Sequence, residues 1–190
     1  MRIGVLVSGR GTNLAALLEA GLPVRLVVSN RAAAAALGIA AEHGVETRVL
    51  RRADHVDAEA RDAALGDAFT RAGVELVVLA GYDQILRPSY FARFGGRTIN
   101  IHPSLLPAHG GAGMMGIAVH RAVLEAGDAE TGATVHEVTP ELDAGPALAQ
   151  VRVPVLADDD PESLAARVLN QEHMLLVRTV QRLVADPPKA

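Results

Sequence analysis

Hydrophobic residues in the first half of the chain fall into short continuous runs, separated by longer segments of mixed polarity. The runs predict strands at Ile3–Val7, Val24–Val28, Thr47–Leu50, Leu76–Ala80 and Thr98–His102. The intervening segments have helical patterns at Leu14–Ala20, Ala32–Glu42 and Ala58–Arg71. Short apolar strands that alternate with helices are typical of a parallel sheet covered on both faces. We therefore predict an α/β fold with an open, mostly parallel, twisted sheet and helices on both faces.

The second half of the chain has a different pattern. Ala133–Val138 and Ala147–Val155 are extended segments joined by a polar turn, and they predict an antiparallel pair of strands. The apolar spacing of Ser163–Val184 predicts a long final helix, with Asp160 or Ser163 as its cap. The sheet is therefore expected to become antiparallel in its carboxyl-terminal half.

The chain has 190 residues, of which 49% are hydrophobic. That length suits one domain with a sizeable core. Because there is no internal repeat and no evident linker, we predict a single domain over residues 1–190. The last residues, Asp186–Ala190, are expected to form a loose tail.

The charge balance and the absence of cysteine narrow the function classes. A net charge of −4 and a pI of about 6.0 argue against nucleic acid as the main partner. Without cysteine, disulfides, thiolate metal sites and a cysteine nucleophile are ruled out. The apolar run Ile3–Val7 is too short for a signal-peptide core, and Ala32–Ala41 is too short for a membrane span. We expect a soluble, cytoplasmic protein with no membrane partner.

A glycine-rich turn, "VSGRGTN", follows the first predicted strand and opens a helix. Gly9 and Gly11 permit unusual dihedral angles, while Thr12 and Asn13 are good helix-capping residues. A helix N-terminus of this kind favours an anion, so a phosphate fits here. A tight strand-to-helix turn without a ligand explains the same residues equally well.

Two familiar phosphate-binding motifs do not fit this turn. A dinucleotide fingerprint requires glycine where the chain has Leu14, and an acid after the second strand where it has Asn30. A P-loop requires a lysine that is not present here.

The segment "NIHPSLLP" places an amide and an imidazole at the end of a strand. Asn100 and His102 are two positions apart, so their side chains lie on the same face, and Pro103 then fixes the chain direction. Asp143, in the loop "TPELDAGP", would orient the imidazole and favour its cationic form if it came close. Spacing alone leaves this open, because Asp143 also suits an Asx turn and His102 a core position. The seven histidines show no metal-ligand spacing such as HExxH, so no metal is expected.

Five blocks of sequence carry a resemblance to a known family. "SGRGTNL", "VLAGYDQIL", "NIHPSLLP", "VHEVTPELDAGP" and "QEH" occur in the order and spacing of the phosphoribosylglycinamide branch of the formyltransferase family. The resemblance runs from Met1 to about Leu183. It implies a Rossmann-like formyltransferase fold, with a nucleotide-binding half at 1–102 and a folate-binding half with the C-terminal helix at 103–190.

The resemblance also implies roles for individual residues. Those implied for the catalytic centre are Asn100, His102 and Asp143. Those implied for binding the ribonucleotide are Gly11, Thr12, Asn13, Leu169, Asn170, Gln171 and Glu172. Those implied for binding the folate are Asp83, Gln84, Ile85, Leu86, Asn100, Thr139, Pro140, Glu141, Leu142 and Asp143.

The implied reaction moves a formyl group from 10-formyltetrahydrofolate to the amine of glycinamide ribonucleotide, in de novo purine biosynthesis. Asn100 and His102 would stabilise an oxyanionic tetrahedral intermediate, with Asp143 tuning the histidine. The partners are then small molecules, with formyl-folate as co-substrate and no metal, and the enzyme is a monomer or a weak homodimer.

Three features depart from the family pattern. Ala58 stands where relatives often carry an arginine, and "YDQ" at Tyr82–Gln84 replaces a more common Phe-Met-Arg. The stretch Ala108–His120 is longer and richer in glycine than usual. Its glycines would make residues 108–116 either a mobile lid or a flexible surface loop.

Other readings of the same residues are a formyl-folate hydrolase, a formyltransferase that acts on another amine, and a nucleotide-binding protein without catalytic activity. A hydrolase is expected to carry a further module ahead of the strand at Ile3. The joint presence of Asn100, His102 and Asp143 argues against a non-catalytic protein.

Overall fold

The structure is a computed structural model, and it describes residues 1–186. Contacts between residues divide the chain into two compact units, of which the first is Met1–Ile99 and the second begins at Asn100. The prediction of one domain with halves at 1–102 and 103–190 is not tested by this division and stays a prediction. The predicted tail lies outside the described residues except for Asp186.

The first unit contains four strands in the order β3-β2-β1-β4, all of them parallel. They are β1 (Ile3–Val7), β2 (Val24–Ser29), β3 (Glu46–Val49) and β4 (Leu76–Leu79). Val5 in β1 pairs with Val27 on one side and Val78 on the other. Every residue of β1 and β4 is buried, because helices cover both faces of this sheet.

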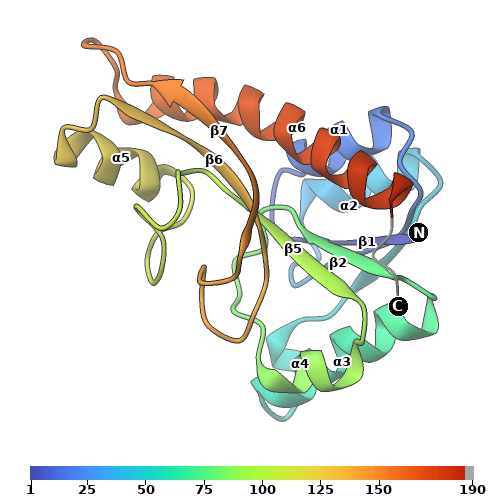
Figure 1. Cartoon of the computed structure of the whole chain (residues 1–190). Coiled ribbons are helices and arrows are strands. Elements are labelled where there is room, and N and C mark those ends of the chain that lie inside the picture. Colours follow the sequence, from blue (N-terminus) through green and yellow to red (C-terminus); the bar gives the residue numbers. More distant parts are fainter. Residues whose placement is uncertain (187–190) are drawn as a thin grey trace. The chain divides into compact units, whose positions relative to one another are not determined.

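The helices of the first unit follow its strands (Figure 1). They are α1 (Thr12–Glu19), α2 (Ala35–Glu42), the 3₁₀ turn η1 (Arg52–Asp54), α3 (Ala58–Arg71) and α4 (Pro88–Arg93). Figure 1 shows α1 and α2 on one side of the parallel strands and α3 and α4 on the other. An aromatic contact joins α3 to the end of α4, since the ring of Phe94 lies 6.0 Å from that of Phe69. The short elements η1 and α4 were not predicted from the sequence.

The second unit contains an antiparallel strand pair and the longest helix. Its elements are α5 (Ile117–Ala126), β6 (Glu130–Glu137), β7 (Ala147–Pro154) and α6 (Pro161–Ala185). α6, drawn in red in Figure 1, runs along the β6–β7 pair and contacts both strands as well as α5. The predicted antiparallel pair is confirmed, with Ala133 opposite Val151.

β5 (Arg97–His102) crosses the boundary between the units, and it completes a seven-stranded mixed sheet in the order β3-β2-β1-β4-β5-β6-β7. The predicted fold class is therefore confirmed: a mostly parallel α/β sheet that becomes antiparallel towards its carboxyl-terminal strands.

The start of α6 resolves a choice that the sequence left open. Asp160 is the cap, because its carboxylate accepts a hydrogen bond from the Ser163 amide at 2.7 Å. The Ser163 hydroxyl in turn accepts from the Asp160 amide at 3.0 Å, which completes a capping box. Pro161 occupies the first turn, where its missing N–H costs nothing.

Helix α5 is the main element that the sequence analysis did not predict. It begins immediately after Gly116, and its C-cap is Gly127, which adopts a left-handed conformation with φ of 70°. Val119 and Val123 are buried at helical spacing. The preceding glycines obscured this signal, because they gave the whole stretch the appearance of a loop. Within residues 1–186, no helix combines the length and the apolar character that a membrane crossing requires.

Candidate active site

The glycine turn of the first unit joins β1 to α1 and is held against α2. Gly11 is the N-cap of α1 with φ of 81°, a conformation that favours glycine. A Cβ added at Gly11 would lie 2.8 Å from the Cα of Ala36, and the amide of Ala36 donates to the carbonyl of Gly9 at 3.1 Å. The turn is therefore tightly fixed, and α1 begins directly after it, so the positive end of the helix dipole lies at Thr12 and Asn13.

Asp83 follows β4 and is the centre of a hydrogen-bonded cluster. Its carboxylate accepts from Asn30 Nδ2 at 2.7 Å, Ser8 Oγ at 3.0 Å and Gln84 Nε2 at 3.1 Å. Arg31 also forms an ion pair with it. Burial alone raises the pKa of Asp83, but these hydrogen bonds and the Arg31 charge outweigh it and leave the pKa below its usual range. Asp83 is thus held ionised where the strands β1, β2 and β4 end.

The rest of the predicted folate segment has mixed surroundings. Ile85 is 57% exposed, whereas Leu86 is buried. The Gln84 Oε1 atom lies 3.4 Å from the guanidinium of Arg61, which is itself fully buried beside Asp62. Of this segment, Ile85 alone presents a large apolar side chain to solvent.

In the second unit, the structure brings three predicted catalytic residues together. His102 Nδ1 lies 3.9 Å from Asp143 Oδ2, which is close enough for an ionic interaction but too long for a hydrogen bond. The loop between β6 and β7 brings Asp143 there, in a left-handed conformation with φ of 53°. Asn100 and His102 both come from β5, as the two-residue spacing predicted. The sequence left open whether Asp143 reaches His102, and the structure places them side by side.

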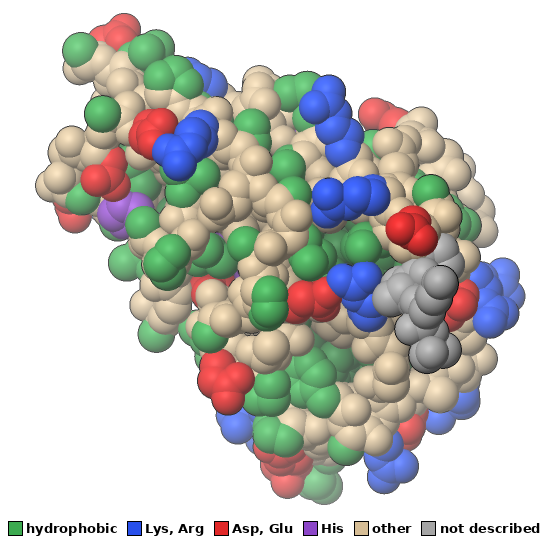
Figure 2. Space-filling view, viewed as in Figure 1, with side chains coloured by type: hydrophobic (Ala, Val, Ile, Leu, Met, Phe, Trp, Pro, Cys, Tyr) green, Lys and Arg blue, Asp and Glu red, His purple; other side chains and the backbone are tan. Residues whose placement is uncertain are grey.

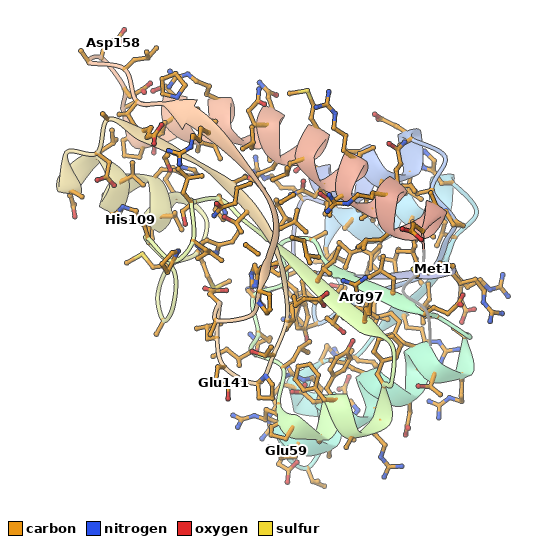
Figure 3. The ribbon with its side chains drawn as sticks, viewed as in Figure 1. Met1, Glu59, Arg97, His109, Glu141 and Asp158 are labelled. Atoms are coloured by element: carbon orange, nitrogen blue, oxygen red, sulfur yellow. The ribbon has the colours of Figure 1, made fainter. Side chains whose placement is uncertain are left out.

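The β6–β7 loop is fixed by Gly145, two residues after Asp143. A Cβ added at Gly145 would lie 2.0 Å from the carbonyl oxygen of Glu137, so only glycine fits there. The Glu137 amide closes the loop by donating to the carbonyl of Pro146 at 3.0 Å. Figure 3 shows Glu141 at the tip of this loop. The predicted folate contacts Thr139–Leu142 therefore stand on a loop whose base is rigid.

The glycine-rich loop before α5 touches both His102 and Asp143. His102 Nε2 donates to the carbonyl of His109 at 2.8 Å, so this nitrogen carries the proton, because a carbonyl can only accept. Asp143 Oδ2 accepts from the Gly111 amide at 2.9 Å. The His109 side chain is itself tied to Asp128, with 2.6 Å between Nε2 and Oδ2. Figure 3 shows His109 beside α5.

His136 is a member of this cluster that the sequence analysis did not single out. Its Nε2 lies 3.1 Å from Asn100 Nδ2 and 3.7 Å from Asp143 Oδ1, and the ring is 2% exposed. Strand alternation could not have singled it out, because β6 buries every residue from Thr131 to His136.

A further histidine, His120 on α5, is also buried near His102. Burial is the main cause of the lowered pKa of His120, and the charge of His102 lowers this pKa further. Its Nδ1 has no hydrogen-bond partner among the described residues. Within residues 1–186, no three histidine or acidic side chains are grouped so as to hold a metal ion.

The predicted ribonucleotide segment Leu169–Glu172 lies in the middle of α6. Glu172 is buried, Leu169 and Gln171 are half-buried, and Asn170 is exposed. On the face of the molecule seen in Figure 2, acidic and basic side chains are interspersed, with no large area of one sign.

The mostly parallel sheet, with a glycine turn at the carboxyl end of β1, defines a Rossmann-like α/β protein. A family model described as "Formyl transferase" matches residues 1–180, and the chain belongs to this family.

Individual relatives agree with this assignment. The chain is 41% identical over 181 residues to phosphoribosylglycinamide formyltransferase from Escherichia coli strain K12, covering 92% of this chain and 83% of the relative. Its fold matches the crystal structure of glycinamide ribonucleotide transformylase 1 from Symbiobacterium toebii with a TM-score of 0.89 at 42% identity, covering 97% and 87% of the two chains. It also matches phosphoribosylglycinamide formyltransferase from Brucella melitensis with a TM-score of 0.88 at 37% identity, covering 100% and 98%.

Proposed function

We propose that the chain transfers the formyl group of 10-formyltetrahydrofolate to the amine of glycinamide ribonucleotide, a step of purine biosynthesis. The observation that carries this proposal is the cluster of Asn100, His102 and Asp143 in a formyl transferase whose relatives are named for that reaction.

The binding residues follow from the family motifs and from the local geometry. Gly11, Thr12 and Asn13 would hold the phosphate of the ribonucleotide, because the turn combines a close backbone approach with a helix N-terminus. Leu169–Glu172 would contact the remainder of the ribonucleotide. Asp83–Leu86 and Thr139–Asp143 would contact the folate.

The chemical step is an addition followed by an elimination. The substrate amine attacks the formyl carbon, a new C–N bond forms, and negative charge collects on the formyl oxygen. Donors from Asn100 and His102 stabilise that oxygen, and the Asp143 carboxylate, 3.9 Å from His102 Nδ1, tunes the imidazole. When the intermediate collapses, the bond from carbon to the folate nitrogen breaks. His102 assists the proton transfer that leaves this nitrogen neutral, and the amine gives up one proton.

The assay mixes purified protein with formyl-folate and glycinamide ribonucleotide and follows the release of folate. Release that requires the ribonucleotide supports transfer, whereas equal release without it identifies a hydrolase. Release that requires a different amine identifies another formyltransferase.

The variant Asp143→Asn tests the negative charge of this residue separately from its role in holding the loop. Asparagine tolerates the left-handed conformation and can still accept from the Gly111 amide, so we expect normal folding. Turnover is expected to fall about 100- to 1000-fold, as when an oxyanion-stabilising group is lost. Asp158→Asn, the same change on an exposed loop, is the control and should keep full turnover. Near-normal turnover of Asp143→Asn would remove Asp143 from the mechanism.

A further inference from the structure

The contact between Asn100 and His136 joins an amide nitrogen to a ring nitrogen. Asn100 Nδ2 and His136 Nε2 are 3.1 Å apart. An amide nitrogen can only donate, so His136 Nε2 must accept, which requires that this ring nitrogen carries no proton.

The other ring nitrogen fixes the same state of His136 independently. Nδ1 lies 2.8 Å from the carbonyl oxygen of Glu137, and a carbonyl can only accept. Nδ1 therefore carries the ring proton. The two contacts together describe a neutral imidazole with its proton on Nδ1 and its lone pair on Nε2.

The surroundings of His136 favour the neutral ring. Burial is the largest influence on its pKa, and it lowers the pKa despite the opposing effects of the Glu137 carbonyl and the Asp143 charge. The His102 charge lowers it further. The ring is thus held as an acceptor at a position that is almost completely inaccessible to solvent.

The unprotonated Nε2 of His136 determines whether the nitrogen or the oxygen of the Asn100 carboxamide faces it. A carboxamide rotated by half a turn exchanges its oxygen for its nitrogen with almost no change in shape. The rotated form is disfavoured, because the lone pairs of Asn100 Oδ1 would then face the lone pair of His136 Nε2. The favoured form uses one hydrogen of Nδ2 for His136 and leaves the second for another acceptor.

We propose that His136 is a positioning residue that fixes the orientation of the Asn100 carboxamide, so that its second N–H remains available to the formyl oxygen. The inference rests on the proposed function, in which Asn100 stabilises the oxyanion. His136 itself is not assigned a contact with substrate.

A double-mutant cycle tests whether His136 acts through Asn100. His136→Phe keeps the ring but removes the acceptor, and we expect kcat to fall about 10- to 100-fold, a part of the loss expected for an oxyanion donor. KM for both substrates should stay within about twofold, because ground-state binding is unaffected. His136→Gln, which can present an amide oxygen to Asn100, should restore most of the turnover.

The combination with Asn100→Ala gives the decisive comparison. If His136 acts only through Asn100, the double variant should turn over no more slowly than Asn100→Ala alone. Losses that multiply would overturn the inference, because His136 would then have a separate effect. Full turnover of the single variant Asn100→Ala would contradict the proposed role of Asn100 in formyl transfer. That result differs from multiplying losses, which would contradict only the role of His136.

A spectroscopic measurement on the unmodified protein requires no variant to fold. In ¹⁵N-labelled protein at neutral pH, the Nδ1 of His136 should have the chemical shift of a protonated ring nitrogen and Nε2 that of an unprotonated one. The opposite tautomer, or a cationic ring, would overturn the inference whatever the kinetic result.

Discussion

The Nε2–H group of His102 donates to the backbone carbonyl of His109 across 2.8 Å. This is a titratable side chain proposed for catalysis, and its donor is occupied by a loop of the same unit. Asp143 is engaged by the same loop through the Gly111 amide. In the proposed reaction, the formyl oxygen or the folate nitrogen would have to replace the His109 carbonyl at that donor. The position of residues 108–116 therefore bears directly on when His102 becomes available.

The attachment of His109 to Asp128 predicts how this loop can be loosened. We expect His109→Ala and Asp128→Asn each to increase amide hydrogen exchange in residues 108–116 roughly 2- to 10-fold, the effect of losing one partly exposed hydrogen bond. Because both changes break the same contact, the double variant should exchange no faster than either single one. Asp54→Asn, which breaks an exposed pair with Arg51 in the first unit, is the control. Unchanged exchange would mean that the loop is held by its backbone contacts alone.

Two glycines in the turn after β1 are expected to respond very differently to the same substitution. At Gly11, an added methyl group meets the Cα of Ala36 at 2.8 Å and a left-handed backbone, so Gly11→Ala must move the turn. At Gly9, an added Cβ meets no atom of the described chain within 4 Å. We expect Gly11→Ala to lower stability by about 1–3 kcal/mol and to weaken ribonucleotide binding at least about 10-fold.

Urea unfolding and titration calorimetry check this pair of variants. Gly9→Ala should unfold at the wild-type midpoint. If Gly11→Ala kept normal affinity for the ribonucleotide despite a displaced turn, the phosphate would have to bind elsewhere.

The buried ion pair between Arg61 and Asp62 should be sensitive to the loss of one partner. Burial raises the pKa of Asp62, while the Arg87 amide and Arg61 act in the opposite direction. Asp62→Ala leaves the guanidinium of a 2% exposed Arg61 without its partner, so we expect a loss of about 3–5 kcal/mol in the free energy of unfolding. Replacing both residues with apolar ones, Arg61→Met with Asp62→Leu, should recover part of that loss.

Urea unfolding with a fitted slope measures these differences. Asp54→Ala breaks an exposed pair and should change stability little. If Asp62→Ala were no more harmful than Asp54→Ala, the buried pair would have no stabilising role.

Much of the fold could be predicted from the sequence because its signals are local. The strands β1 and β4 are apolar throughout since both faces are covered, and α6 begins at a capping box within four residues. The antiparallel pair β6–β7 was visible as two extended segments with a polar turn between them. In each case the residues that carry the signal lie within one element or its immediate flank.

The candidate site was harder to predict because its contacts join residues far apart in the chain. Asn100 meets His136, and Ser8 meets Asp83, only after strand order has been established. Helix α5 was missed because the glycines before it dominated the pattern. Asp83 accepts hydrogen bonds from Ser8 and Asn30, which follow the strands β1 and β2, and local sequence spacing does not reveal these contacts.

Buried neutral histidines should make the stability of the protein depend on pH. The pKa of His120 is lowered in the folded state, chiefly by burial, so the folded protein resists the proton that the unfolded chain accepts near pH 6.5. The stability contribution is therefore complete above about pH 6.5 and is lost as the pH falls from there towards the folded-state pKa. His136 contributes with the same sign, because its pKa is lowered as well.

His120→Gln should reduce this loss. Each histidine contributes at most about 1.4 kcal/mol per pH unit to the slope, so between about pH 7.5 and about pH 5.5 the variant should lose less free energy of unfolding than the wild type. His43→Gln makes the same change on an exposed ring and should follow the wild type. Urea unfolding at both pH values measures the difference. Equal losses in wild type and His120→Gln would show that this ring takes up its proton as readily in the folded state as in the unfolded chain.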